Sequence, residues 1–87
     1  MIKIVYGNSF LKSVKKLPKQ QQEKLADLLE VLRENPFHQL LHAKSLTGSL
    51  AGFYSFRITR DWRVIFQFVN PQTIKLIEAA HRKDIYR

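Results

Sequence analysis

Residues 53–69 read FYSFRITRDWRVIFQFV. This stretch contains two β-type runs, Phe53–Ile58 and Trp62–Val69, which are separated by Thr-Arg-Asp. Both runs are rich in aromatic and β-branched residues, and their apolar side chains alternate with polar ones. The stretch therefore predicts an antiparallel β-hairpin with one strongly apolar face.

The register of this hairpin follows from its apolar side chains. Successive side chains of a strand point to opposite faces, so pairing the large apolar residues sets Phe56 opposite Val64. The same register sets Arg57 directly opposite Arg63 on the other face. Like charges in this position destabilise a sheet, whereas an anion-binding surface gains from them. The second face therefore either binds phosphate or carries two solvated surface arginines that splay apart.

Elements on both sides of the hairpin follow from periodicity and turn residues. Residues 2–6 alternate like a short strand, and residues 10–17 carry apolar side chains at helical spacing until Pro18 interrupts them. The clearest helix spans Lys19–Asn35, an irregular segment follows, and Thr73–Ala79 forms a last strand before a polar tail. We therefore expect one α+β domain over residues 1–87, of order β-α-α-β-β-β, with two helices packed on one face of a mostly antiparallel four-stranded sheet.

Composition limits the range of partners and sites. The 87 residues include 15 Lys and Arg against 7 Asp and Glu, a net charge of +8, which indicates a polyanionic or acidic partner. The absence of cysteine excludes disulfides, thiolate nucleophiles and Cys-based metal sites. No apolar run approaches the roughly 20 residues of a membrane span, and the N-terminus does not resemble a signal peptide. We expect a cytoplasmic protein that does not bind membranes.

Further basic and aromatic residues are expected beside the arginine pair. Lys44 precedes the hairpin, and His81 continues the alternation of the last strand onto the face that the helices leave open. Arg82 and Tyr86 follow, and Trp62 opens a strand. Cations interleaved with aromatic rings suit single-stranded RNA, whose phosphates need positive charge and whose bases need a stacking surface.

Several motifs together resemble one known family. They are Leu46-Thr47-Gly48, Gly52-Phe53-Tyr54-Ser55-Phe56-Arg57, Arg60-Asp61-Trp62-Arg63-Val64-Ile65-Phe66 and His81-Arg82-Lys83-Asp84-Ile85-Tyr86. Their order and spacing resemble the RelE/ParE superfamily of bacterial toxin–antitoxin toxins, and most of all its RelE branch. The expected β-α-α-β-β-β order fits the same superfamily, so the resemblance spans the whole chain.

The resemblance implies an mRNA interferase, a metal-independent endoribonuclease that cuts mRNA in the ribosomal A site. The ribose 2′-OH would attack the adjacent phosphate and release a 2′,3′-cyclic phosphate or 3′-phosphate and a 5′-OH. It also implies a cognate antitoxin that neutralises the toxin, and contact with operator DNA only through the toxin–antitoxin complex. No cofactor or metal ion is implied.

The resemblance also implies roles for individual residues. Arg63 matches a strand arginine that stabilises charge on the phosphate, and Arg57 stands where the family carries Lys or His. His81 and Arg82 match a basic pair after the last strand, with His81 suited to proton transfer, and Tyr86 matches a C-terminal aromatic residue that stacks on or orients the RNA.

The resemblance also implies roles for four further residues, Lys44, Asp61, Trp62 and Lys83. Lys44 lies near a basic or His position of one sub-branch, where it would act as the base or hold phosphate. Asp61 and Trp62 resemble a pair that matters for activity in another sub-branch, although a turn carboxylate and a packing anchor explain them equally well. Lys83 adds positive charge for RNA.

A second activity stays open on the same fold. A ParE-like toxin would inhibit DNA gyrase without being a nuclease, and an inactive RNA-binding module would be a third case. His81 followed by Tyr86, with Arg63 on the sheet, favours the nuclease.

Overall fold

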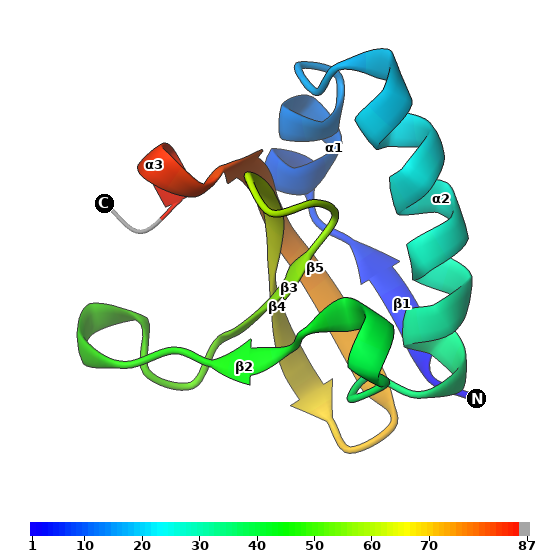
Figure 1. Cartoon of the computed structure of the whole chain (residues 1–87). Coiled ribbons are helices and arrows are strands. Elements are labelled where there is room, and N and C mark those ends of the chain that lie inside the picture. The colour runs from blue at the N-terminus through cyan, green and yellow to red at the C-terminus, as the bar shows by residue number, and fades with distance from the viewer. Residues whose placement is uncertain (86–87) are drawn as a thin grey trace.

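The structure, a computed structural model, describes residues 1–85 (Figure 1). Two 3-10 turns, η1 (Gln39–Leu41) and η2 (Gly48–Leu50), lie in the segment that the sequence leaves irregular. In chain order, the helices and strands are β1 (Lys3–Tyr6), α1 (Asn8–Val14), α2 (Lys19–Glu34), β2 (Lys44–Ser45), β3 (Tyr54–Arg57), β4 (Trp62–Asn70), β5 (Thr73–His81) and α3 (Arg82–Ile85).

The sheet has five strands in the order β1-β5-β4-β3-β2. β1 pairs with β5 in parallel, and the other neighbours are antiparallel. The predicted α+β class is confirmed, but the expected number of four strands is wrong. The additional strand, β2, has only two residues, and so short a segment carries no alternation that a sequence reading can detect.

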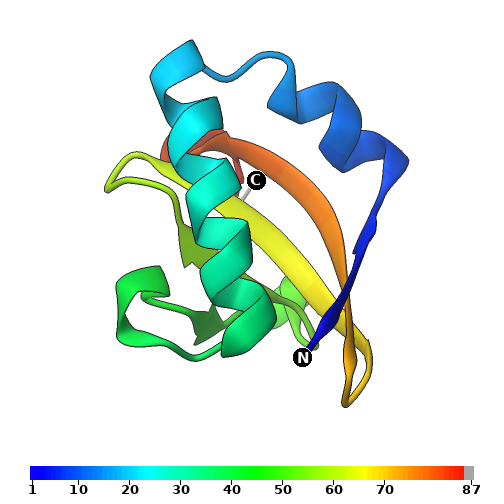
Figure 2. The same cartoon turned by 90° about the vertical axis from the view of Figure 1, so that its right-hand side faces the viewer.

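Helices α1 and α2 cover one face of this sheet (Figures 1 and 2). α2 begins directly after its N-cap residue, Pro18, and it buries Leu25, Leu28 and Leu32. These leucines join a core that includes the apolar side chains of β3, β4 and β5. The predicted hairpin register is confirmed, because Phe56 pairs with Val64 in the middle of that core.

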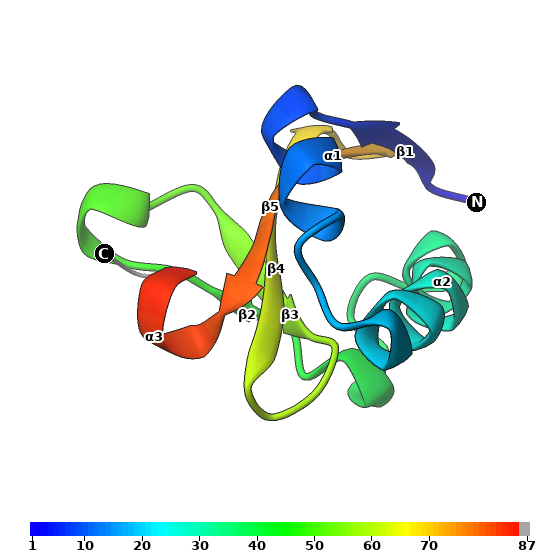
Figure 3. The same cartoon turned by 90° about the horizontal axis from the view of Figure 1, so that it is seen from above.

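The expected architecture left the opposite face of the sheet uncovered. In the structure, part of that face is covered. α3 and the segment around η2 lie on that side of the sheet (Figure 3), and α3 packs against β4 and β5. Residues 82–85, expected in a polar tail, form this helix because Ile85 is apolar and becomes buried. Ile65 and Ser55, which point to the same face, are also buried.

A β-bulge in β5 reverses the faces near the end of that strand. Ile65 pairs with Glu78, but the next residue of β4, Phe66, pairs with Leu76, so Ile77 has no partner. An extra residue on one strand sends every later side chain of that strand to the other face. Residues 78–81 therefore point to the faces opposite those predicted from strict alternation.

Helices long and apolar enough to cross a membrane are absent from the described residues, 1–85.

Candidate nucleic-acid interface

The two arginines of the hairpin lie directly opposite each other, as predicted. Arg63 is buried, with 8% of its surface exposed, and its Nη2 donates a long hydrogen bond of 3.4 Å to the Arg60 carbonyl. Among the described residues, the buried Nε atoms of Arg57 and Arg63 have no hydrogen-bond partner, and neither guanidinium forms an ion pair. Buried, unpaired donors on neighbouring cations are costly, and a bound anion would satisfy them.

Lys44 adds a third cation to this arrangement. It pairs with Ser55 across the β2–β3 ladder, and Ser55 is two residues from Arg57 on the same strand. Lys44 and Arg57 are therefore diagonal neighbours on one face, and Arg63 lies beside Arg57. We call Lys44, Arg57 and Arg63 the cationic face.

Glu78 also points to the cationic face, a position that the sequence analysis did not predict. It pairs with Ile65, which makes it a diagonal neighbour of Arg63, and it is exposed. Without the bulge at Ile77, alternation would have pointed Glu78 toward the helices. No local sequence signal marks this bulge, so only the strand register reveals the carboxylate.

His81 does not lie on the cationic face, contrary to the expectation from alternation. The bulge turns it to the helix-covered side, where its ring meets Trp62 edge to face, with ring centroids 5.2 Å apart. Its Nδ1 accepts a hydrogen bond from the Lys83 backbone N–H at 3.2 Å. In the neutral ring the proton is therefore on Nε2, whose N–H can donate a hydrogen bond.

Asp61 and Arg82 connect the β3–β4 turn to the start of α3. Arg82 Nε lies 3.4 Å from the Asp61 carboxylate, and the Arg82 backbone N–H donates to the Asp61 carbonyl at 2.7 Å. Asp61 thus pairs with Arg82 and holds the chain next to His81. Lys83 is exposed on α3, and Tyr86 lies outside the described residues.

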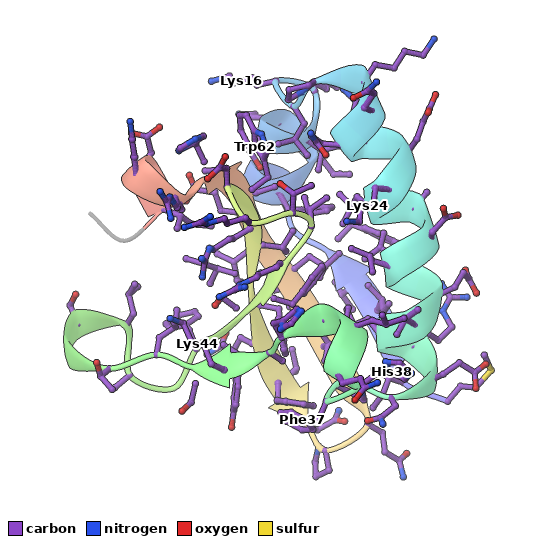
Figure 4. The ribbon with its side chains drawn as sticks, viewed as in Figure 1. Lys16, Lys24, Phe37, His38, Lys44 and Trp62 are labelled. Carbon is purple, nitrogen blue, oxygen red and sulfur yellow. The ribbon has the colours of Figure 1, made fainter. Side chains whose placement is uncertain are left out.

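The predicted surface is therefore divided into two groups at one end of the sheet. Trp62 and Arg63 are consecutive in β4 and point to opposite faces, so His81 and Trp62 lie on one side and the cationic face on the other. Figure 4 shows Trp62 near α1, whereas Lys44 projects from β2 away from the long helices. Among residues 1–85, no group of three His, Asp or Glu side chains is placed to hold a metal ion.

Comparison with known proteins identifies the family. Residues 4–86 match the family described as ParE toxin of type II toxin–antitoxin system, parDE. No curated protein matches the chain.

Three solved structures illustrate the shared fold. YafQ from E. coli strain BL21(DE3) has a TM-score of 0.82 and 21% identity, with 100% of both chains covered. The YoeB/ParE toxin from Agrobacterium tumefaciens has a TM-score of 0.77 and 25% identity, over 93% of this chain and 99% of that one. The E. coli DinJ–YafQ toxin–antitoxin complex matches with a TM-score of 0.79 and 20% identity, over 99% and 98%. Because the family match spans nearly the whole sequence, this chain belongs to the ParE toxin family, within the RelE/ParE superfamily of toxins from type II toxin–antitoxin modules.

Proposed function

We propose that this toxin is an endoribonuclease that cuts mRNA in the ribosomal A site and is neutralised by a cognate antitoxin. The observation that carries the proposal is the pair of opposed arginines, whose buried Nε atoms have no hydrogen-bond partner among residues 1–85. A phosphate is the natural ligand for such a pair, because each planar guanidinium can donate two hydrogen bonds to it. DinJ–YafQ, a structural neighbour, is a toxin–antitoxin complex, which supports the antitoxin.

The chemistry we propose is an intramolecular transphosphorylation. The 2′ oxygen attacks phosphorus, the bond from phosphorus to the 5′ oxygen breaks, and a proton passes to the departing 5′ oxygen. Arg57 and Arg63 stabilise the charge on the phosphate, and Lys44 holds the phosphate or removes the 2′ proton. His81 can protonate the 5′ oxygen as the imidazolium, which gives up its Nε2 proton and becomes neutral; in that form Nδ1 carries a proton and no longer accepts the hydrogen bond from the Lys83 N–H. The proposal also includes Tyr86, which would stack on or orient the RNA.

The separation of His81 from the arginine pair offers a reason for the proposed cleavage to depend on the ribosome. The arginine pair and His81 lie on opposite sides of the sheet end, so both can contact one linkage only when the RNA bends across that end. Fixing a substrate in a reactive conformation supplies much of the rate of such reactions, and the ribosomal A site would hold the mRNA in this way. We place the toxin in the cytoplasm, with operator DNA contacted only through the antitoxin complex.

A second candidate function is inhibition of DNA gyrase, and the family match is the one observation that favours it. The matching family is described as the ParE toxin of parDE, whereas the arginine pair favours a phosphate substrate. The two functions differ in a direct assay, because only the nuclease breaks mRNA.

To test the proposal, purified toxin is added to a translation extract and new mRNA ends are mapped by primer extension. The same toxin is tested in a gyrase supercoiling assay. We expect breaks inside codons and no effect on supercoiling. Arg63→Ala should reduce cleavage by about two to three orders of magnitude. Arg63→Met, which keeps the apolar stem, separates loss of chemistry from loss of packing, and Arg33→Ala on α2 is the control. Full activity of both Arg63 variants, or inhibited gyrase with intact mRNA, would refute the nuclease.

A further inference from the structure

A hollow of about 320 Å³ opens beside the Trp62–His81 ring pair, between the end of the sheet and α1. Leu17 forms part of its apolar lining, and Lys16 contributes a cation from the loop between α1 and α2. Figure 4 shows Lys16 and Trp62 at the same end of the molecule. Two acidic residues also border the hollow: Asp84 of α3, and Glu78, whose strand register points its side chain to the cationic face.

A side chain from α1, Ser13, lines the hollow and connects α1 to β5. Ser13 Oγ accepts a hydrogen bond from the Ala79 backbone N–H at 2.9 Å and donates one to the Phe10 carbonyl at 2.9 Å. β1 ends at Tyr6, which pairs with Leu76, so it does not extend far enough to pair with Ala79. Ser13 therefore replaces the missing strand as a hydrogen-bond partner, and it fixes the end of β5 that carries His81.

We propose that this hollow binds a nucleotide next to the cleaved linkage, with its base against Trp62 and its phosphate on Lys16. The inference rests on the proposed function for its substrate class, single-stranded RNA, and adds a site and a residue to it. Trp62 and His81 are both partly exposed, so an aromatic surface is accessible to a base. Base–aromatic stacking makes a large contribution to single-strand binding and tolerates any base.

The charges around the hollow set the orientation of the nucleotide. Glu78 and Asp84 repel phosphate, so the phosphate must lie on the side of Lys16, which is exposed and forms no ion pair with another described residue. Carboxylate oxygens also accept hydrogen bonds from the amino groups of bases. Trp62 is adjacent to Arg63 in β4, so an RNA strand that crosses the end of the sheet passes from the cationic face directly into the hollow.

The test uses the only tryptophan of the chain, Trp62, as a reporter. The probe is a short 2′-O-methyl RNA oligonucleotide, which cannot be cleaved because its attacking hydroxyl is blocked. We expect saturable quenching of Trp62 fluorescence by this probe and none by inorganic phosphate. An oligonucleotide of the same length without bases should quench little, because the proposed contact requires a base.

The Lys16→Gln variant tests the phosphate contact. We expect it to weaken oligonucleotide binding about 5-fold and to lower the slope of log affinity against log salt by about 0.7. Lys12→Gln is the control. It also removes one positive charge, but Lys12 lies on α1 and does not line the hollow, so oligonucleotide affinity should change by less than about 2-fold.

The outcomes separate this site from the nuclease activity. Absence of quenching, or equal effects of Lys16→Gln and Lys12→Gln, would overturn the nucleotide site even if mRNA is cleaved. Quenching with the expected Lys16 dependence would support the site even in a toxin that fails to cut mRNA, because the probe measures binding alone.

Discussion

At the scale of single residues, the arginine pair is expected to lower the stability of the fold while it strengthens RNA binding. Arg57 and Arg63 repel each other across the β3–β4 ladder, and their buried Nε atoms have no hydrogen-bond partner within the described part of the chain. Arg57→Met keeps the length of the stem but removes the charge and the unpaired donor. We expect its free energy of unfolding to rise by up to about 1 kcal/mol in urea titrations, while RNA binding falls.

Arg57→Lys is the matched control for the rise in the free energy of unfolding that we expect from Arg57→Met. It keeps the positive charge opposite Arg63, so it should show little or no stabilisation. If Arg57→Met instead lowers the free energy of unfolding by more than about 1 kcal/mol, the guanidinium contributes to the fold, and the interpretation of the pair as an anion site loses its physical basis.

Ser13 gives a second prediction at this scale. Ser13→Ala leaves the Ala79 N–H without its partner, and we expect a loss of about 1–2 kcal/mol in the free energy of unfolding. Ser9→Ala, an exposed serine on the same helix, should change it by less than about 0.5 kcal/mol. Equal effects in urea unfolding would mean that the hydroxyl contributes nothing beyond helix propensity.

At the scale of elements, the turn from β1 into α1 depends on Gly7. A Cβ at this position would lie 2.6 Å from the Leu76 carbonyl oxygen, and the Gly7 N–H donates to the same carbonyl at 3.0 Å. Its φ of −69° is open to any residue, so the requirement for glycine is close approach and not strain. We expect Gly7→Ala to cost about 1–3 kcal/mol in thermal or urea unfolding.

Gly52→Ala provides a contrast to this prediction. Gly52 has a φ of +93° and nothing within 4 Å of an added Cβ, so any cost there comes from the backbone conformation. If Gly7→Ala leaves stability unchanged, β1 and β5 separate more easily than their hydrogen bonds suggest.

The sequence predicted some elements well and missed others for physical reasons. The pairing of Arg57 with Arg63 follows from matching apolar side chains along two strands, and the structure has the same register. The position of His81 required knowledge of the bulge at Ile77, which depends on how β5 meets its neighbours. Alternation is a local property of one strand, whereas a bulge is a property of a pair, so single-strand reasoning placed His81 on the wrong face.

At the scale of the whole molecule, the net charge opposes the compact state. The chain carries +8, yet in the described part of the chain only two ion pairs are recorded, Glu30–Arg33 at 4.0 Å and Asp61–Arg82 at 3.4 Å, with side chains 36–68% exposed. Exposed pairs of this kind contribute little, so repulsion among the cations dominates the electrostatic part of the free energy of unfolding.

Added salt should therefore raise the stability of the free toxin while weakening its binding to RNA. Screening of the repulsion between about 20 and 200 mM NaCl is expected to stabilise the fold by about 1 kcal/mol, which corresponds to a rise in Tm of roughly 4–8 °C. The variant with Lys12, Lys15 and Lys19 changed to Gln, whose net charge is reduced from +8 to +5, should show a smaller rise in calorimetry. RNA affinity should fall over the same range, because bound phosphates release counterions from the RNA. A Tm that decreases with salt would mean that attraction between charges outweighs repulsion, and the excess of cations would then have no cost for an anionic ligand to relieve.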